Sequence, residues 1–218
     1  MKDKLKSIYN HAGNLLELIN QLLDFRKLEM GGESLKLHQD DIVEFVRYIG
    51  SGFKELATNR SIKFSIESEC PGMNIWFDDT KMQRILNNIY SNAFKFTPDG
   101  GLISTIVATE KKDEKIFVRI EISDTGCGIS EKDLNVIFDR FYQSEPIPGV
   151  TGSGIGLHMV KEYVSLHNGK IEVHSKIGVG TTFLIYIPSD LKGDDSESKI
   201  PAMSPDVEEK VVYSDRKT

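Results

Sequence analysis

Two periods of hydrophobic residues divide this chain into expected helices and strands. Apolar side chains recur every three or four residues in residues 3–29, 41–57, 78–97 and 154–168, and a shorter helix is expected within 130–141. Apolar and polar residues alternate, or short apolar runs occur, in residues 34–37, 61–67, 74–77, 102–109, 116–122, 170–175 and 181–187, which we expect to be strands. The runs 102–109 and 116–122 are expected to pair antiparallel, and 170–187 to form a hairpin. This succession predicts an α+β fold of two layers.

The first expected helix differs from the others because its apolar residues form a heptad-like seam. Leu5, Ile8, Ala12, Leu15, Ile19 and Leu22 make the seam, and Leu16 and Leu23 widen it as in a helical bundle. Such a helix must bury its apolar side against a partner helix, either from another chain or from a segment outside this sequence. Gly31 and Gly32 end the helix. We therefore expect three parts: residues 1–32, a folded domain over 33–188, and a polar, acid-rich disordered linker or tail over 189–218.

Composition narrows the classes of function. The 218 residues are 39% hydrophobic and 28% charged, which is typical of a globular protein with one sizeable domain or two small ones. The net charge of −6 argues against nucleic-acid binding as the main task. Cys70 and Cys127 stand apart without a CxxC pair, which suits a reducing cytosol and argues against structural zinc. No apolar run is long enough to span a bilayer, and no signal peptide opens the sequence.

The helix expected over residues 78–97 carries a polar stripe beside its apolar one. Asn88, Asn92 and Lys95 are spaced four and three residues apart and so lie on one face. Asparagine is a poor helix former because its amide competes for backbone hydrogen bonds, so this stripe needs an explanation. An amide oxygen for Mg²⁺ and an ammonium group for phosphate provide one. A solvated face that happens to carry two amides is the alternative.

Two glycine-containing segments follow downstream. In Asp124-Thr125-Gly126-Cys127-Gly128 the glycines permit a tight turn against a flat ligand, and the carboxylate suits an exocyclic amine such as that of adenine. A plain surface turn is the alternative. Residues 152–157, Gly-Ser-Gly-Ile-Gly-Leu, open an expected helix, where bare amides and the helix dipole favour a phosphate. Their spacing matches neither a Rossmann motif nor a P-loop, and a flexible hinge is the alternative.

Taken in order, these segments resemble the ATP-binding catalytic domain of sensor histidine kinases, which belongs to the GHKL superfamily. Residues 88–97 resemble its N box, 124–129 its G1 box, 138–142 its F box, 152–157 its G2 box and 178–183 its last hairpin. The similarity covers residues 34–188, and five motifs in the correct order rarely arise by chance. Residues 22–29 resemble the second helix of the dimerisation and phosphoacceptor hairpin, and similar sequences occur in hybrid two-component sensors. The resemblance implies the Bergerat fold, with a mixed sheet and helices on one face.

The resemblance also implies a role for each matching residue. Asn92 would coordinate Mg²⁺ at the phosphates of ATP, while Asn88 and Lys95 would contact the phosphate chain. Asp124 would accept a hydrogen bond from the adenine amino group. The other implied residues of the ATP site form the base pocket (Phe96, Gly126, Gly128, Ile129 and Thr181 or Thr182), the lid (Phe141, Tyr142) and the phosphate cradle (Gly152, Ser153, Gly154, Ile155, Gly156, Leu157).

Two positions bear on the reaction. ATPases of the same fold have a glutamate as general base where this chain has Asn88, and an amide cannot remove a proton from water, which favours phosphoryl transfer to a histidine over hydrolysis. Gln143 stands where many members have a basic residue after the Phe-Tyr pair, which puts one lid contact with the phosphates in doubt.

The acceptor histidine of the family is followed by an acidic residue, and none of the five histidines of this chain is: His11, His38, His158, His167 and His174. We therefore expect the chain to bind Mg–ATP without phosphorylating itself. The implied partners are ATP, the phosphoacceptor helix of the full-length protein, a response-regulator receiver domain and a second copy of the protein through the N-terminal helix. The implied location is cytoplasmic, as the cytosolic part of a membrane-anchored sensor. The alternatives are a nucleotide-binding signalling module without phosphoryl transfer and, less favoured by Asn88, an ATPase.

Overall fold

The computed structural model describes residues 34–112, 114–143 and 153–192, together with residues 19, 22, 23, 25, 26, 28 and 30. Contacts divide the chain into two units, one of residues 1–33 with 199–218 and one of residues 34–198. In the first unit the described residues from Ile19 to Leu28 are helical, and the Met30 N–H donates to the Arg26 carbonyl oxygen (3.1 Å). The rest of the predicted apolar seam, and the predicted tail beyond residue 192, lie outside the described residues.

The second unit is built on a five-stranded sheet with the order β2-β4-β5-β7-β6. Its strands are β2 (Lys63–Ser68), β4 (Leu102–Lys112), β5 (Lys115–Asp124), β6 (Lys170–Lys176) and β7 (Gly180–Pro188). β2 and β4 run parallel and the other pairs antiparallel, so the sheet is mixed, as expected. Both predicted hairpins are present, β4–β5 and β6–β7. A separate antiparallel ribbon pairs β1 (His38–Asp41) with β3 (Asn74–Phe77).

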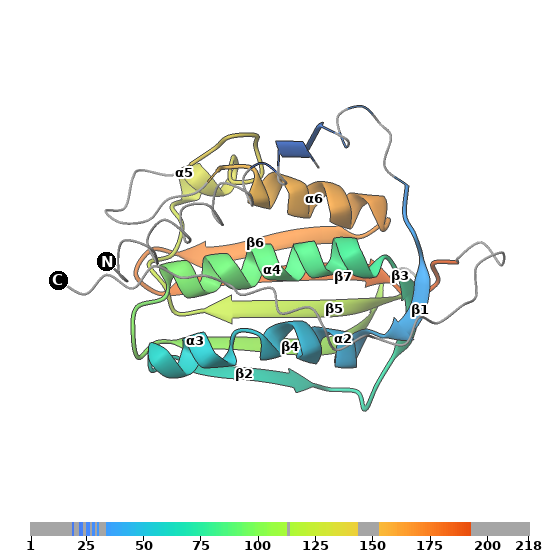
Figure 1. Cartoon of the computed structure of the whole chain (residues 1–218), viewed down its shortest axis with the longest axis horizontal. Helices are drawn as coiled ribbons and strands as arrows, with labels where there is room; N and C mark the ends of the chain where they lie inside the picture. Colours follow the sequence, from blue (N-terminus) through green and yellow to red (C-terminus); the bar gives the residue numbers. More distant parts are fainter. Residues whose placement is uncertain are drawn as a thin grey trace, which may run out of the picture. The chain divides into compact units, whose positions relative to one another are not determined.

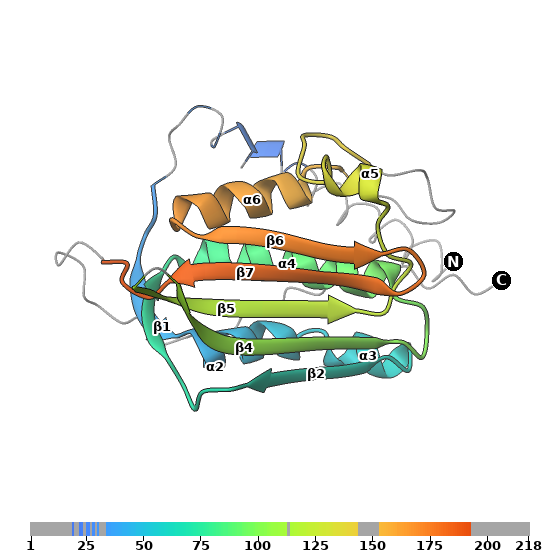
Figure 2. The ribbon, with the colours of Figure 1, turned by 180° about the vertical axis from the view of Figure 1, so that it is seen from behind.

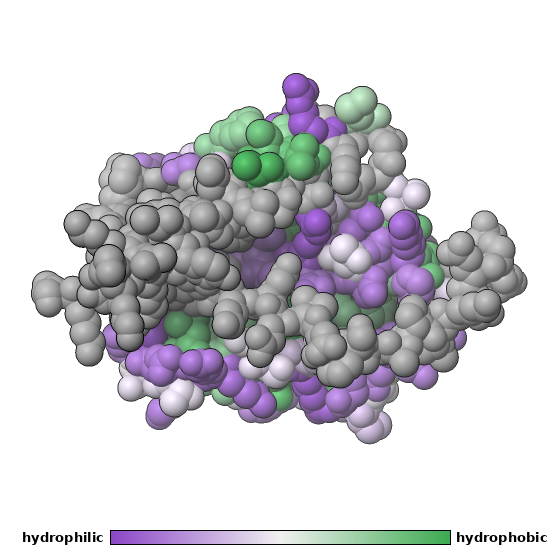
Figure 3. All heavy atoms as spheres, viewed as in Figure 1, coloured by the Kyte–Doolittle hydropathy of each residue, from purple (hydrophilic) through white to green (hydrophobic). Residues whose placement is uncertain are grey.

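Helices cover one face of this sheet, which confirms the predicted two-layer sandwich. The helices are α2 (Ile42–Ser51), α3 (Lys54–Asn59), α4 (Asp79–Phe96), α5 (Glu131–Leu134) and α6 (Gly156–Leu166). Figure 1 shows α2, α3 and α4 in front of the strands and α6 along β6, and in Figure 2 the strands lie in front of α2, α3 and α4. Alternate residues of the central strands fill the core between the layers, including Val118, Ile120 and Ile122 of β5 and Ile185 and Ile187 of β7. The outward surface at α3 is mainly hydrophilic, as Figure 3 shows.

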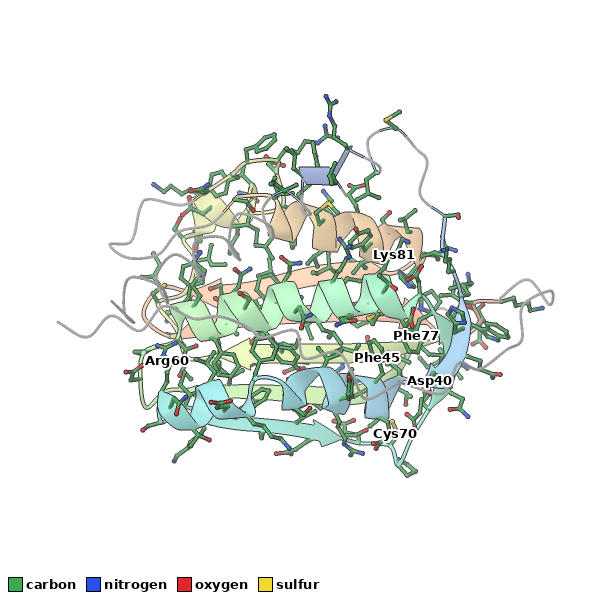
Figure 4. All side chains as sticks on the ribbon, viewed as in Figure 1. Asp40, Phe45, Arg60, Cys70, Phe77 and Lys81 are labelled. Carbon is green, nitrogen blue, oxygen red and sulfur yellow. The ribbon has the colours of Figure 1, made fainter. Side chains whose placement is uncertain are left out.

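Capping at both ends defines α4, the helix that carries the asparagines. The Asp78 carboxylate accepts a hydrogen bond from the Lys81 N–H (2.9 Å) and so satisfies one free donor of the first turn. At the other end the Arg60 guanidinium donates to the carbonyl oxygens of Phe94 and Thr97 (2.7 Å to the latter). Figure 4 labels Lys81 and Arg60 near these two ends. Pro98 follows and prevents the helix from continuing.

Three predicted elements differ from the structure. Residues 34–37 are not a strand, because the ribbon with β3 begins at His38. The single helix expected over 41–57 is interrupted at Gly52 and Phe53, where hydrogen bonds to residues three positions earlier replace the α-helical pattern. The interruption lets Phe53 stack on Phe94 of α4 with ring centroids 5.3 Å apart, so tertiary packing overrides the local pattern. The short helix expected within 130–141 is a single turn, Glu131–Leu134.

Candidate functional site

The predicted site segments meet at one end of the helix layer. The C-terminal half of α4 lies against the start of α6, because the Asn88 side-chain oxygen lies next to the Cα of Gly156. A Cβ on Gly156 would fall well inside van der Waals contact of that oxygen. The Asn88 side-chain nitrogen donates to the Arg84 carbonyl oxygen one turn earlier (2.8 Å), while its amide oxygen lies toward Gly156. Two segments 68 positions apart in the sequence (156 − 88) are thereby joined.

Asn92 and Lys95 continue this polar stripe along α4, and both are half-buried. Burial lowers the pKa of Lys95, and its ammonium nitrogen lies 5.0 Å from the centroid of the Phe96 ring. A partly desolvated ammonium interacts strongly with an anion because fewer water molecules compete for it. The stripe therefore provides two amide groups and one cation on one face of α4, and its Asn88 oxygen lies beside the start of α6.

The donor set fits a magnesium ion that arrives with the nucleotide. Asn88 and Asn92 provide neutral amide oxygens, and among the described residues no three His, Cys, Asp or Glu side chains are grouped as a metal site. Mg²⁺ prefers oxygen ligands, retains several waters and is commonly held by one or two protein groups together with substrate phosphates. An Asn92 oxygen suits such a shared site and would be a poor resident site by itself.

Asp124 ends β5 and is held in place from two directions. Its carboxylate accepts hydrogen bonds from the Gly126 N–H (2.7 Å) and from the Thr181 N–H. Burial raises the pKa of Asp124, while these two hydrogen bonds act in the opposite direction. Two backbone donors leave further acceptor capacity on a carboxylate, which can take about four hydrogen bonds in all.

The turn after Asp124 is docked on the β6–β7 hairpin. Gly128 has φ = +73°, and a side chain there would overlap the Lys176 carbonyl oxygen, so only glycine fits. The Gly178 N–H donates to the Cys127 carbonyl oxygen (2.8 Å), and the Ile129 N–H donates to the Ser175 hydroxyl oxygen (2.8 Å). The hairpin therefore sets the shape of this turn.

Residues 138–143 are fastened to α5 and α6. The Tyr142 hydroxyl donates to the Asp133 carboxylate (2.7 Å), which lowers the pKa of Asp133. His158 of α6 forms a hydrogen bond through Nδ1 with the Phe138 carbonyl oxygen (3.1 Å). The Phe141 side chain is exposed and its backbone, at φ = +60°, packs against Gly154. The backbone of Phe141 thus contacts the segment that leads into α6.

The structure separates the two threonines predicted to support the base. Thr181 pairs with Asp124 across β5 and β7, so the two side chains share the helix-covered face of the sheet. Thr182 lies on the opposite face, where its hydroxyl pairs with that of Ser123 (2.8 Å). The geometry assigns the place beside Asp124 to Thr181 and not to Thr182.

The start of α6 carries the remaining predicted residues. Ile155 is buried, Leu157 is half-buried, and the Ser153 hydroxyl oxygen accepts a hydrogen bond from the Ile155 N–H (3.3 Å). Among the described residues, the N-cap residue Ile155 makes no side-chain cap hydrogen bond to the first turn of α6, whose first residue, Gly156, lies beside Asn88. Gly152 and the lid loop over 144–151 lie outside the described residues.

Comparison with known proteins decides the family. The model of the family described as histidine kinase-, DNA gyrase B-, and HSP90-like ATPase matches residues 77–191, more than half of the chain. The chain belongs to this family. Among the described residues, no helix combines the length and apolar character needed to cross a membrane.

Within this family the relatives are histidine kinases. Histidine kinase P4 of Formosa agariphila is 38% identical over 190 residues, which is 85% of this chain and 14% of that protein. Hybrid signal transduction histidine kinase D of Dictyostelium discoideum is 37% identical over 196 residues, 86% of this chain and 12% of that protein. The structure of full-length ShkA in complex with AMPPNP matches with a TM-score of 0.73 and 26% identity, over 86% of this chain and 38% of that one. These matches support the interpretation of this chain as the ATP-binding catalytic region of a sensor histidine kinase. The chain spans only a small part of the length of these relatives.

Sequence reasoning on this kinase domain missed several residues that shape the site. Ser175, Asp133 and His158 each hold a backbone or hydroxyl group of a predicted motif, yet none lies within a motif that we identified. Asp133 is three residues after Ser130, which caps α5, and this is a detectable local signal. The roles of Ser175 and His158 depend on pairing across the fold, for which the local sequence contains no signal.

Proposed function

We propose that this chain binds Mg–ATP and transfers the γ-phosphoryl group to a histidine on a dimerisation helix of its own full-length protein. The observation that carries the proposal is the contact of the Asn88 amide oxygen with the Cα of Gly156, which joins the asparagine stripe of α4 to the open N-terminus of α6. A phosphate chain placed there meets amide oxygens, the Lys95 ammonium and helix N–H groups at once. Asp124, the last residue of β5, is available to bind the base.

In this proposal the protein acts by positioning and by charge. Mg²⁺, when bound at Asn92, neutralises phosphate charge and orients the phosphate oxygens. Lys95 adds a second positive charge, and the first N–H groups of α6 donate hydrogen bonds to the phosphates. The Asp124 carboxylate holds the base in one position. The γ-phosphoryl group of the bound nucleotide then lies at a constant distance from Asp124, along α4. Transfer to the histidine then proceeds in line, with the acceptor nitrogen as nucleophile.

Asn88 favours transfer over hydrolysis. A water molecule becomes an effective nucleophile when a general base removes its proton, and an amide cannot do so. Asn88 also uses its side-chain nitrogen on the Arg84 carbonyl oxygen, which leaves an oxygen that accepts hydrogen bonds but has no basicity at neutral pH. We therefore expect slow phosphate release by the chain alone.

The wider partners follow from the same proposal. The helix predicted over residues 1–32 forms part of a dimerisation hairpin. A receiver domain of a response regulator accepts the phosphoryl group, and the catalytic region works on the cytosolic side of a membrane-anchored sensor of the hybrid type. The relatives that support this include a hybrid signal transduction kinase.

Reconstitution in trans tests the proposal. The chain is mixed with Mg²⁺, γ-labelled ATP and a separately produced hairpin that supplies the acceptor histidine. We expect acid-labile, base-stable label on the hairpin, none on the chain alone, and none when the acceptor histidine is replaced. ATP binding without label on the hairpin would refute phosphoryl transfer and favour a nucleotide-binding signalling module. Steady phosphate release by the chain alone would instead favour an ATPase.

A further inference from the structure

Three side chains form a row across the end of the sheet. Thr181 of β7 pairs with Asp124 of β5 on one side and with Ser175 of β6 on the other. Directly opposed residues in antiparallel strands direct their side chains to the same face. Because Ile122 and Phe183, the next pair on this face, are buried under the helices, the row lies on the helix-covered face at the edge of the proposed base pocket.

The hydrogen bonds of Ser175 use its full capacity. Its oxygen accepts the Ile129 N–H (2.8 Å) and lies 2.9 Å from both the Gly180 carbonyl oxygen and the Thr181 hydroxyl oxygen. A carbonyl oxygen can only accept, so the single Ser175 proton must point to Gly180. The proton between the two hydroxyls must then come from Thr181.

This assignment makes Thr181 a pure acceptor toward any ligand. With its proton directed at Ser175, the Thr181 hydroxyl presents only lone pairs elsewhere. The neighbouring Asp124 carboxylate is also an acceptor. The end of the base pocket therefore offers two acceptors side by side, which suits the amino group at position 6 of adenine and disfavours the carbonyl group at position 6 of a 6-oxopurine, since two acceptors repel each other.

We propose that Ser175 is a positioning residue that determines specificity for a 6-aminopurine over a 6-oxopurine, by directing the proton of Thr181 away from the base. The inference rests on the proposed function, namely that the base of ATP binds at Asp124. Ser175 does not touch the nucleotide. It acts through its hydrogen bond with Thr181 and through the hydrogen bond that it accepts from the Ile129 N–H in the turn beneath the base.

Affinities for ATP and for ITP, which has a carbonyl group in place of the 6-amino group, test the inference on the 218-residue chain with Mg²⁺. We expect the unmodified chain to prefer ATP and Ser175→Ala to reduce the ATP-to-ITP affinity ratio by about 3- to 10-fold, the equivalent of one net hydrogen bond. The ratio falls because ATP binds less tightly while ITP binding is retained, since the freed Thr181 proton can then donate to the carbonyl group. Thr181→Val should reduce the ratio as well. Adding Ser175→Ala to Thr181→Val should reduce it little further, because Ser175 acts on position 6 of the base through the Thr181 hydroxyl, which Thr181→Val has already removed.

Ser189→Ala is the matched control. The Ser189 hydroxyl also donates to a backbone carbonyl oxygen, that of Ile116 (2.9 Å), but just beyond the opposite end of β7. We expect its ratio to equal that of the unmodified chain. An unchanged ratio in Ser175→Ala, or an equal loss of both nucleotides, would overturn the inference while the proposed function stands. No ATP binding by the unmodified chain would overturn the proposed function itself. If Ser175→Ala does not fold, Thr181→Val alone decides, since an unchanged ratio there also overturns the inference.

Discussion

Replacing Asp124 with asparagine tests the base site most directly. The carboxylate accepts the Gly126 and Thr181 N–H groups, and in the proposed complex it also accepts the 6-amino group of ATP. An asparagine oxygen can serve the backbone donors, and its NH₂ group then faces the amino group, so that two donors meet. Hydrogen bonds to charged groups contribute about 1.5 to 3 kcal/mol, which corresponds to a loss of about 10- to 150-fold in ATP affinity.

Stability should respond differently from affinity. Burial raises the pKa of Asp124 in the folded chain, so at neutral pH the ionised carboxylate makes folding less favourable than a neutral group would. Asparagine removes that charge and weakens the two backbone hydrogen bonds, and these effects oppose each other. We expect Tm to change by no more than about 4 °C, roughly 1 kcal/mol in a domain of this size.

Titration calorimetry with Mg–ATP and thermal unfolding of the free protein measure the two quantities. Asp99→Asn is the matched control, because Asp99 is exposed and pairs with Arg60 (2.8 Å) near the end of α4; its affinity should be unchanged. Binding by Asp124→Asn within about 2-fold of the unmodified chain, less than one net hydrogen bond, would refute the assignment of the base site. A loss of affinity that merely follows a large fall in Tm would show that Asp124 serves the fold and not the ligand.

Three further predictions address other parts of the domain. Asn92→Ala should abolish the difference between the ATP affinities measured in Mg²⁺ and in EDTA, while its affinity in EDTA stays within about 3-fold of that of the unmodified chain. If calorimetry shows that Mg²⁺ still increases the ATP affinity of this variant as much as that of the unmodified chain, the metal role of Asn92 is wrong. Gly128→Ala should lower the free energy of unfolding by at least about 3 kcal/mol, because the new side chain overlaps the Lys176 carbonyl oxygen and the backbone is also strained. Gly178→Ala is the control: Gly178 has a similar positive φ but open space around it, so the substitution should lower the free energy of unfolding by only about 1 kcal/mol. Equal losses for the two variants in urea unfolding would refute the packing argument. Burial lowers the pKa of His167, which accepts the Asp78 N–H, so the unfolded chain binds the proton more tightly. Stability should therefore be complete above pH 6.5 and fall as pH drops below it, by at most about 1.4 kcal/mol per pH unit for one proton, and His167→Gln should remove this dependence in denaturant titrations at several pH values.

Local sequence patterns were sufficient to predict the bounds of those helices and strands whose ends depend only on neighbouring residues. β3 has the predicted bounds, Asn74–Phe77, and α4 begins after the Asp78 cap and ends before Pro98 as its signals indicate. The two hairpins were predicted because short connections favour antiparallel neighbours. The break between α2 and α3 was missed because Phe53 is drawn to Phe94, 41 positions away (94 − 53), and no local signal reports that contact.

For the site, the sequence determined which chemical groups are available, since amides at helical spacing, a carboxylate beside glycines and a glycine-rich helix start are local features. It also determined that an amide stands at residue 88, which bears on hydrolysis. Only the tertiary structure decided which groups meet: Asn88 with Gly156, Asp124 with Thr181, and Thr181 rather than Thr182 on the helix-covered face. The physical reason is that side-chain spacing along one element follows from its own period, whereas register between strands and packing between helices depend on the whole core.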